Sequence, residues 1–477
     1  MAIKSNLKYV TDYDLREITL ITSTGIISLK NQLVELNFFE DIFAGTLSAQ
    51  LVVSDGMGII AGVSMNGTEY IKITLDKAGT PGTEIERMFR VFSVSNRSIS
   101  INNTFENYTI NMCSDEFMLS EQYRICKSYK NESISNIIKD ILTRFLKVGT
   151  DVTKTVSVED TVLKYDFILP NKKIFETINW LSTYAMPMNG SSGTGNGMQG
   201  ADMLFFENND GFFFASLSTL YKQDAFANYV FAPKNIQVPE NLSAHQQFYN
   251  VLNFEILDSF DTLRATTNGT FSNRLITFDP LTRKKYVTDY SYDEMTGKKN
   301  SSLNPYPVTN NYANRFGQAM YESPISGQNV AFEAGVLRFA PSNYNQPNQT
   351  EYIKQIPGSV ANDINAENFI PNRVAQLGLS QYQRVRITVP GNPQLFVGMT
   401  LNFTAYGIGE VSDKRERRPD PYLSGKYLVS AIRHVINDTS YISVVELCKE
   451  SNIEAYSGIN KSDALWNKIV AGEWELK

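Results

Sequence analysis

The residues that could do chemistry in this chain are few. Its 477 residues include only 2 histidines, His245 and His434, and 3 cysteines, Cys113, Cys126 and Cys448. A hydrolase with a Ser-His-Asp or Cys-His arrangement needs a histidine as its general base, so only these two are candidates. His434 lies among apolar residues of an expected strand, His245 precedes two glutamines in an expected polar loop, and neither accompanies a nucleophile motif. We therefore predict two structural histidines and no catalytic residue.

The spacing of the other reactive side chains does not indicate a metal or cofactor site. Zinc sites usually include a pair of ligands about two to five residues apart, and these histidines and cysteines contain no such pair. The odd cysteine count also argues against a disulfide framework, and Cys113 and Cys448, at the ends of expected strands, are interpreted as small core residues. Paired acids such as Glu84 with Glu86, or Asp258 with Asp261, could cleave a glycoside if they converged. We interpret them as solvated or turn-capping groups.

A glycine-rich loop at residues 189–200 invites comparison with phosphate-binding loops. A P-loop needs a Lys-Ser/Thr pair that enters a helix, and a dinucleotide fingerprint needs a strand before the glycines and a helix after them. Here an expected helix precedes the loop and an apolar segment follows it. We therefore predict a surface loop with no bound cofactor.

Composition limits the remaining function classes. Aromatic residues are 12% of the chain, with 28 Phe and 25 Tyr, which is typical of a globular protein with large packing surfaces. The net charge of -6 argues against a general nucleic-acid binder, because phosphate contacts require clustered Lys and Arg. Residues 1–9 contain no apolar signal region, and the sequence has no apolar run long enough to span a bilayer. We expect synthesis in a cytoplasm and no stable membrane insertion.

Both ends of the chain have the pattern of antiparallel β structure, at residues 17–114 and 382–449. Short apolar runs rich in β-branched and aromatic residues alternate with Gly, Asn, Asp and Ser clusters. Small barrels are a common way to hide the edges of such short strands. The expected strands are 18–21, 33–38, 47–53, 71–75, 89–94, 108–112, 385–389, 400–403, 427–434 and 441–447, the last two joined by a turn at 436–439.

The middle of the chain contains the expected helices. Residues 134–147 place isoleucines and leucines on one stripe, with Ser133 as the N-cap, and a second helix is expected over 172–185. A strand is expected at 165–169 between them. Residues 203–214 read as two apolar strands that meet at Asn-Asp-Gly, a sequence that favours a tight β-hairpin.

The helix and the hairpin resemble parts of the central baseplate hub protein of contractile-tailed bacteriophages, a family that is also similar to the N-terminal half of type VI secretion spike proteins. Several weaker pieces agree with this family in chain order, so the resemblance covers about residues 15–450. The pieces are 34–55 with Phe-Glu-Asp-Ile-Phe at 39–43, Phe-x-x-Ile-x-Trp-Leu at 175–181, the hairpin with its continuation to 220, 258–264 followed by Gly269, 277–282, 389–393 with Val397-Gly398, and 424–429 with His434.

The resemblance implies a fold and an assembly. Chains of this family contain two barrels similar to the tail-tube subunit, and three chains form a ring of six barrels. The chain is therefore expected to be a homotrimer that contacts the tail tube protein above, the central spike protein below and baseplate wedge proteins around it. Residues corresponding to the spike barrel and needle are missing before the end at residue 477, so the spike is expected to be a separate polypeptide.

The same resemblance implies a structural role in the virion. The expected function is that of a baseplate hub in the phage tail, without enzyme activity, through whose lumen DNA passes only in transit during genome ejection. An acidic lumen would repel that DNA, which is a hypothesis that the net charge supports. The alternative is a baseplate-associated hydrolase that degrades cell wall or glycan.

We expect an α+β fold that is mostly β, with two tail-tube-like antiparallel β-barrels and inserted α/β and loop-rich regions. The expected divisions are a first barrel in 1–115, an inserted α/β domain in 116–240, the start of the second barrel with a loop-rich insertion in 241–381, the remainder of that barrel in 382–450, and a tail in 451–477. Region 283–360 resembles the family least.

Two segments keep alternative interpretations. The charged residues 413–421 are either a solvated loop or a contact with a neighbouring subunit or the tube. The tail at 451–477 contains Trp466 and Trp474 near helical spacing, and it is either a docking element for spike or wedge or a strap on its own domain.

Overall fold

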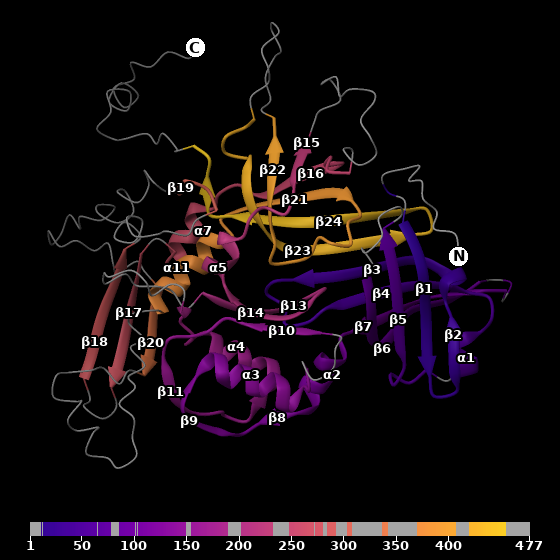
Figure 1. Ribbon diagram of the computed structural model, residues 1–477, viewed down its shortest axis with the longest axis horizontal. Coiled ribbons are helices and arrows are strands. Elements are labelled where there is room, and N and C mark those ends of the chain that lie inside the picture. The colour runs from indigo at the N-terminus through magenta and orange to yellow at the C-terminus, as the bar shows by residue number, and fades with distance from the viewer. Residues whose placement is uncertain are drawn as a thin grey trace, which may run out of the picture.

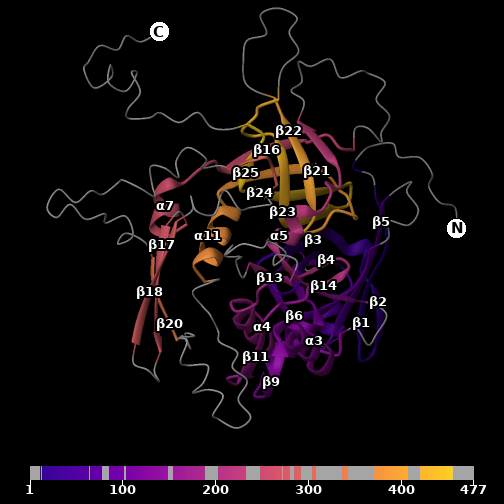
Figure 2. The ribbon, with the colours of Figure 1, turned by 60° about the vertical axis from the view of Figure 1, so that its left-hand side comes forward.

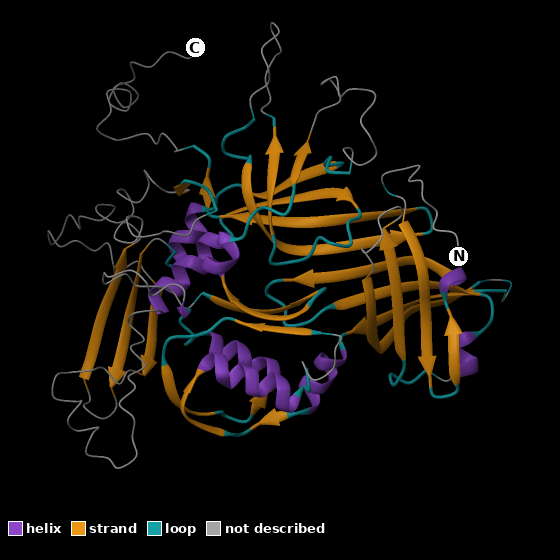
Figure 3. Ribbon diagram, in the orientation of Figure 1, coloured by secondary structure: helices purple, strands orange, loops and turns teal. Residues whose placement is uncertain are grey.

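The computed structural model of the chain is mostly β, with large antiparallel sheets and a smaller helical part (Figure 1, Figure 3). The predicted fold class is therefore confirmed. The structure describes residues 13–63, 65–77, 85–100, 104–148, 154–188, 202–231, 248–270, 272–279, 284–291, 303–307, 336–341, 370–406 and 419–454, together with Thr11 and Asn102.

The first β region contains the strands predicted near the N-terminus. Side chains alternate between a buried and an outward face, as along β4, where Ala49, Leu51 and Val53 point into the core. That core also contains residues from the short helix α1 (Ile59–Val63) and from the segment around the 3-10 helix η1 (Lys30–Gln32). The strands are β1 (Tyr13–Thr22), β2 (Gly25–Ser28), β3 (Leu33–Asp41), β4 (Ser48–Asp55), β5 (Tyr70–Lys77), β6 (Ile85–Ile99) and β7 (Glu106–Cys113).

The second β region combines strands from the middle of the chain with those predicted near residue 400. Its core is a separate hydrophobic cluster that includes Phe403, Tyr427 and Val445. The predicted turn near 436–439 is present, since Asn437 pairs with Ser440. The strands are β15 (Asn228–Phe231), β16 (Asn253–Asp258), β21 (Gln383–Pro390), β22 (Thr400–Ala405), β23 (Gly425–Asn437) and β24 (Ser440–Lys449), with β25 (Ser451–Asn452) paired to β19 (Tyr306–Pro307).

The two β regions are parts of one 13-stranded sheet, because β3 pairs antiparallel with the C-terminal half of β23 (Figure 1). The path of neighbouring strands runs β16-β21-β24-β23-β3-β4-β7-β6-β5-β1-β2, and β22 and β15 branch from β23. Among the described residues, the two ends of this path, β16 and β2, do not pair with each other. The sequence predicted two related units but not this uninterrupted hydrogen bonding between them.

The two β regions repeat the same arrangement of strands. The order β3-β4-β7-β6-β5 in the first corresponds to β16-β21-β24-β23-β22 in the second, and every neighbouring pair in both is antiparallel. Both repeats also contain the same irregularity, a shift of register between Val91 and Ser93 in β6 and between Val429 and Ala431 in β23. A bulge at the matching position of matching strands indicates a common structural unit.

The inserted helical part confirms the predicted helices with slightly different ends. Helix α3 (Ile134–Phe145) begins at Ser133, whose hydroxyl accepts a hydrogen bond from the amide of Asn136 at 3.3 Å. It ends before the predicted residue because Lys147 has a positive φ of 55°. The second helix is α4 (Ile174–Ser182). Other elements are α2 (Asp115–Gln122), β8 (Arg124–Ile125), β9 (Ser128–Ser133), β10 (Thr155–Val158), the predicted strand β11 (Lys164–Ile168), β12 (Lys172–Lys173) and α5 (Leu217–Lys222).

The predicted hairpin lies where two hydrophobic clusters meet. It consists of β13 (Met203–Asn208) and β14 (Gly211–Ser216). Phe206 belongs to the core of the second β region, whereas Phe205 and Phe212 belong to the core of the helical part and stack with ring centroids 5.8 Å apart. Figure 1 shows the hairpin between the helices and the large sheet. Each face of the hairpin therefore fills a different core.

A further sheet lies apart from the 13-stranded one (Figure 2). Strand β17 (Ser272–Asp279) pairs antiparallel with β18 (Lys284–Ser291) and parallel with β20 (Val336–Pro341). The last two strands lie within region 283–360, where the sequence indicated a loop-rich insertion and no particular strand was predicted. Helices α7 (Thr262–Thr267) and α11 (Ile370–Ser380) precede and follow this sheet along the chain. No described helix has the length and apolar character needed to cross a membrane.

The hairpin turn provides a test of the fold, because Gly211 has a φ of +146° and a Cβ atom there would lie 2.1 Å from the Thr155 carbonyl oxygen. We expect Gly211→Ala to destabilise the protein by about 2 kcal/mol, since β10 must move away from β14. Urea unfolding measures this. Gly25→Ala is the matched control, because Gly25 also has a positive φ, +156°, but has no atom within 4 Å of the added Cβ. Equal losses in the two variants would contradict a steric cause.

Candidate functional site

One face of the large sheet is lined by polar side chains that continue across both β regions. Directly opposed residues lie on the same face of a sheet, so the register identifies the members of this row. From β16 to β6 the cross-strand neighbours are Glu255, Arg386, Glu446, Ala431, Asp41, and then Asn37, Gln50, Asn111 and Ser93. We call this row, with Glu35, Arg433 and Ser95, the polar face.

Ion pairs and hydrogen bonds connect neighbouring members of the polar face. Arg386 contacts Glu446 at 2.7 Å and Glu255 at 3.2 Å, so it bridges three strands. At the junction between the β regions, the guanidinium of Arg433 donates to Asn37 at 2.9 Å and contacts Glu35 at 3.2 Å. Such exposed pairs add little stability, about 1 kcal/mol or less each, so their main effect is on the charge of the surface.

The polar face has no strong electrostatic attraction for a polyanion. Its carboxylates include Glu35, Glu255 and Glu446, and its cations include Arg386 and Arg433, which are already engaged by those acids. In the first β region the polar face includes neutral groups, and the side-chain amide of Asn111 donates to the hydroxyl of Ser93 at 3.0 Å and to that of Ser95 at 2.9 Å. A surface of this kind can remain wetted and can let a phosphate backbone pass without binding it.

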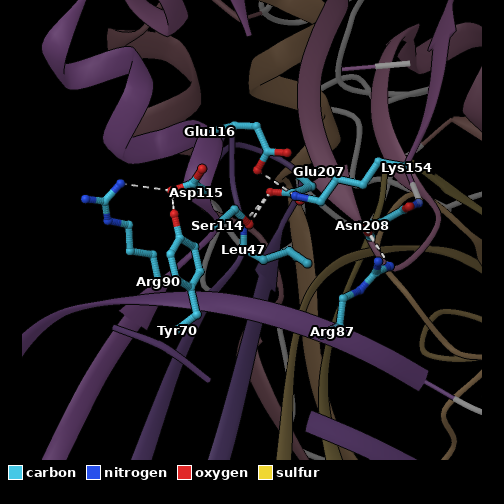
Figure 4. Close-up of polar contacts among 10 residues, drawn as sticks. All are labelled: Leu47, Tyr70, Arg87, Arg90, Ser114, Asp115, Glu116, Lys154, Glu207 and Asn208. Carbon is cyan, nitrogen blue, oxygen red and sulfur yellow. Dashed lines mark hydrogen bonds and ion pairs between the residues drawn. The ribbon is translucent and has the colours of Figure 1, made fainter. Parts of the chain in front are cut away.

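Behind the sheet, a buried ionic cluster holds the hairpin to the first β region (Figure 4). The carboxylate of Glu207 accepts hydrogen bonds from the amide of Leu47 at 3.0 Å and from the hydroxyl of Ser114 at 2.6 Å. Its other oxygen lies 2.8 Å from the ammonium of Lys154, which also contacts Glu116 at 2.6 Å. We call these five residues the Glu207 cluster. They come from β13, from the residues directly before β4 and directly after β7, and from the helical part.

Burial makes the partners in the Glu207 cluster interdependent. The Glu207 side chain is 1% exposed and that of Lys154 is 18% exposed. Burial lowers the pKa of Lys154, but the carboxylates of Glu207 and Glu116 outweigh this effect and raise that pKa above its ordinary value. The lysine therefore stays charged, and removal of one partner would leave a buried charge uncompensated.

A second buried acid, Glu40, connects the first β region to the second. It accepts a hydrogen bond from the amide of Val397 at 3.0 Å, and burial raises its pKa to about 8. Arg87, whose guanidinium donates to the carbonyl of Asn208 at 3.5 Å, partly offsets that rise. Glu40, Arg87, Phe38 and His434 help to line one small pocket of about 20 Å³, which has room for roughly one water.

His434 is a buried structural residue, as the sequence predicted for its surroundings. Its ring Nδ1 lies 2.9 Å from the Ser443 hydroxyl and 3.0 Å from the Tyr441 hydroxyl. Burial lowers its pKa to about 4, so the ring is neutral near pH 7. Ser443 has a relative exposure of 0%, so a substrate cannot reach a Ser-His pair here.

The acids singled out from the sequence do not form a catalytic pair in the described part of the chain. Glu86 contacts Lys72 at 2.9 Å, Asp258 contacts Arg384 at 2.6 Å, and Asp261 accepts from the amide of Arg264 at 2.8 Å at the start of α7. The turn-capping interpretation of Asp261 is thus confirmed. Glu84 lies outside the described residues, as does His245.

The remaining predicted features are cysteines, whose positions the structure gives, and segments that lie mostly outside the described residues. Cys113 and Cys448 are buried and free, as predicted for small core residues, and Cys126 is exposed. The described ranges contain no group of three His, Cys, Asp or Glu side chains that could hold a metal ion. Loop 189–200, most of segment 413–421 and tail residues 455–477 lie outside the described residues, so their alternatives stay open.

Sequence reasoning missed both the polar face and the Glu207 cluster. The one available signal was a charge that follows an apolar run, since Glu207 comes directly after Leu204-Phe205-Phe206. Its partners lie 160 positions away at Leu47 and 93 positions away at Ser114, so no local pattern could identify them.

Comparison with known proteins places these features in context. No family model matches the sequence. The chain is 21% identical over 448 residues to a probable baseplate hub protein of Vibrio phage KVP40, covering 91% of this chain and 94% of that protein. The resemblance to phage baseplate hub proteins is therefore confirmed.

Two solved structures share the fold. A tail protein from Neisseria meningitidis MC58 superposes with a TM-score of 0.50 at 8% identity, covering 91% of this chain and 96% of that chain. The 43 kDa tail protein of prophage MuSo2 from Shewanella oneidensis superposes with a TM-score of 0.50 at 9% identity, covering 91% and 98%. At such low identity these matches establish the fold alone.

The Glu207 cluster can be tested by Glu207→Gln, which keeps an oxygen for Leu47 and Ser114 but removes the charge that faces Lys154. We expect a loss of about 3 kcal/mol in the free energy of unfolding, because a buried charge loses its partner. Urea unfolding gives the value. Glu176→Gln removes an exposed pair with Lys172 and should leave the unfolding midpoint unchanged. Similar midpoints for both variants would show that the cluster does not hold the hairpin.

Proposed function

We propose that this chain is a structural baseplate hub protein of a contractile phage tail, located in the virion. Sequence similarity over nearly its full length to a probable baseplate hub protein supports this assignment, and so does the fold shared with phage tail proteins. The observation that carries the proposal is the joined repeat: two β units of the same strand order form one continuous sheet. A wall made of repeated units is what a ring around a channel requires.

The proposed assembly is a homotrimer in which three copies of the double unit form a ring of six. Such a ring would contact the sixfold tail tube on one side and the threefold central spike on the other, with baseplate wedge proteins around it. Its mechanism would be symmetry matching and transmission of force. Burial of the unit-to-unit contact inside one chain supports this idea, because half of the contacts in the ring are then made before assembly.

The proposed role is not enzymatic. His434 is enclosed, and the acids considered for glycoside cleavage that the structure describes pair with cations or cap a helix. The polar face, with its mixed charges, supports a lumen through which DNA passes in transit. The host cytoplasm would be the site of synthesis before assembly into the tail.

Copy number in the assembled tail tip tests the proposed ring. We expect cryo-electron microscopy of intact tails to show three copies of this chain, arranged as six β units around the tail axis between tube and spike. One copy or six copies would overturn the trimer. Purified chain should also release no fragments from peptidoglycan or host glycans, and measurable release would favour the hydrolase alternative.

The polar face generates a second prediction for genome ejection. We expect Glu35→Lys combined with Glu446→Lys to slow DNA release severalfold, because uncompensated cations in the lumen would bind passing phosphates. Time-resolved ejection from purified virions measures the rate. Glu176→Lys combined with Glu121→Lys, which makes the same charge change at exposed positions of α4 and α2, is the control. Equal rates for the two would contradict a lumen position for the polar face.

A further inference from the structure

The contact between the two β units extends beyond strand pairing, because each unit inserts a side chain into the other core. Ile42, directly after β3, is 1% exposed and lies in the hydrophobic cluster of the second β region. In return, Ile436 from the end of β23 is 0% exposed and lies in the cluster of the first region. The junction is therefore a reciprocal exchange of apolar residues across a pair of strands.

The repeat contains a counterpart of Ile436 that has no such core around it. Ile436 lies opposite Tyr441 in the β23–β24 hairpin, and Ile99 lies opposite Glu106 in the matching β6–β7 hairpin. Counted from the matching cysteines Cys448 and Cys113, Tyr441 and Glu106 occupy the same position. Yet Ile436 is 0% exposed and Ile99 is 61% exposed. An isoleucine at an interface position of the repeat is thus left in solvent.

The segment after β16, which corresponds to the residues after β3, also exposes apolar side chains. Strand β16 occupies the place of β3 in the repeat. Phe39 is aligned across one intervening strand with Cys113, and Asp258 is aligned in the same way with Cys448, so Phe39 and Asp258 correspond. The segment just after Asp258 carries Phe260, 67% exposed, and Leu263, 80% exposed. Large apolar side chains at such exposure are typical of an interaction surface.

The backbone edges at these two places are also unpaired within the described chain. The N-terminal part of β6, Ile85–Arg90, pairs with β5, and the Val91 amide donates to the Glu69 carbonyl, whereas the paired residues of Ser93–Ile99 contact β7 alone. In the repeat, the matching half of β23 pairs with β3 on that side. Strand β16 pairs with β21 alone, whereas its counterpart β3 pairs with both β4 and β23. Open edges of this kind readily pair with another chain.

We propose that the edge of β16 in one copy pairs antiparallel with residues 93–99 of β6 in the next copy, repeating the β3–β23 junction between chains. Ile99 would then enter the second core of the neighbour, and Phe260 would reach the neighbour's first core. The occupant is a second copy because β16 and β6 are the counterparts of β3 and β23, which pair with each other. This inference rests on the proposed ring and specifies its contact.

The two edges carry different charged side chains. The free half of β6 carries Arg97, whose side chain is 45% exposed, while β16 carries Glu255, 61% exposed, and Asp258, 34% exposed. Because the two edges differ, the contact is head-to-tail, and such contacts close into rings when the rotation permits.

The within-chain junction also predicts the register of the contact. Arg433 of β23 pairs with Phe39 of β3, and counting through the shared bulge makes Ser95 the counterpart of Arg433 and Asp258 that of Phe39. The amide of Ile42 donates to the carbonyl of Ser430 at 2.9 Å, so these two residues form a hydrogen-bonded pair. Hydrogen-bonded and non-hydrogen-bonded pairs alternate along an antiparallel ladder, so Phe39 and Arg433, three positions further, form a non-hydrogen-bonded pair. In such pairs the side chains lie close enough for a disulfide.

Cysteine cross-linking of the full-length chain tests this register. In a Cys126→Ser background, Ser95→Cys with Asp258→Cys should form intermolecular disulfides under mild oxidation, seen as covalent oligomers on a non-reducing gel. Ser95→Cys with Asn253→Cys is the matched control, because five residues along a strand move the thiols about 16 Å apart. Phe39→Cys with Arg433→Cys should form a disulfide within one chain, which would show that a cysteine pair in this register can be oxidised.

The outcomes separate this contact from the ring itself. Oligomers in native mass spectrometry without a Ser95–Asp258 cross-link, or with equal cross-linking at Asn253, would overturn the pairing and leave the ring intact. A chain that stays monomeric and uncross-linked would also overturn the pairing, whereas the ring is decided by copy number in the tail.

A second variant gives a reversible measure of the same contact. Ile99→Asp changes an exposed residue, so the monomer should still fold, and the dissociation constant for self-association should rise about tenfold or more. Ile26→Asp, at a 72% exposed position on β2, is the control and should leave that constant unchanged. Unchanged association in Ile99→Asp would contradict the proposal.

Discussion

The pairing of β3 with β23 is the constraint on which the rest of the structure depends. It joins strands from opposite ends of the chain, and Arg433 contacts Asn37 across 396 positions of sequence. A slip of one residue would turn Ile436 and Glu40 away from the cores that enclose them. Both hydrophobic clusters of the sheet therefore close only when the two ends have met in this register.

The polar groups buried near this junction make the arrangement specific. Glu40 binds the amide of Val397, and Glu207 binds that of Leu47, so each acid satisfies a backbone group of a different segment. Apolar contacts alone would tolerate several relative positions of sheet and hairpin. An unpaired buried carboxylate is costly, so these contacts penalise every other position. The hairpin thereby holds the helical part and both β regions in one geometry.

The two units of the repeat differ in how their edges are covered. The same strand order is used twice, but Ile42 and Ile436 at the junction are buried, whereas Ile99 at the end of β6 and Phe260 after β16 are exposed. A closed sheet edge is stable in water, and an open edge with apolar flanks needs a partner. The chain thus contains one buried junction between its two β units and two exposed edges that correspond to the strands of that junction.

The sequence by itself determined the local elements, because their signals are local: alternation for the strands of both ends, an isoleucine stripe with Ser133 for α3, and Asn-Asp-Gly for the hairpin. It also identified His434 as a core residue from its apolar neighbours. Only the tertiary structure decided that both ends share one sheet, that Glu207 is an ionic anchor, and that strands form within 283–360. Strand partners and buried ion pairs depend on residues far apart in the chain, and no spacing within a single strand encodes which distant edge it will meet.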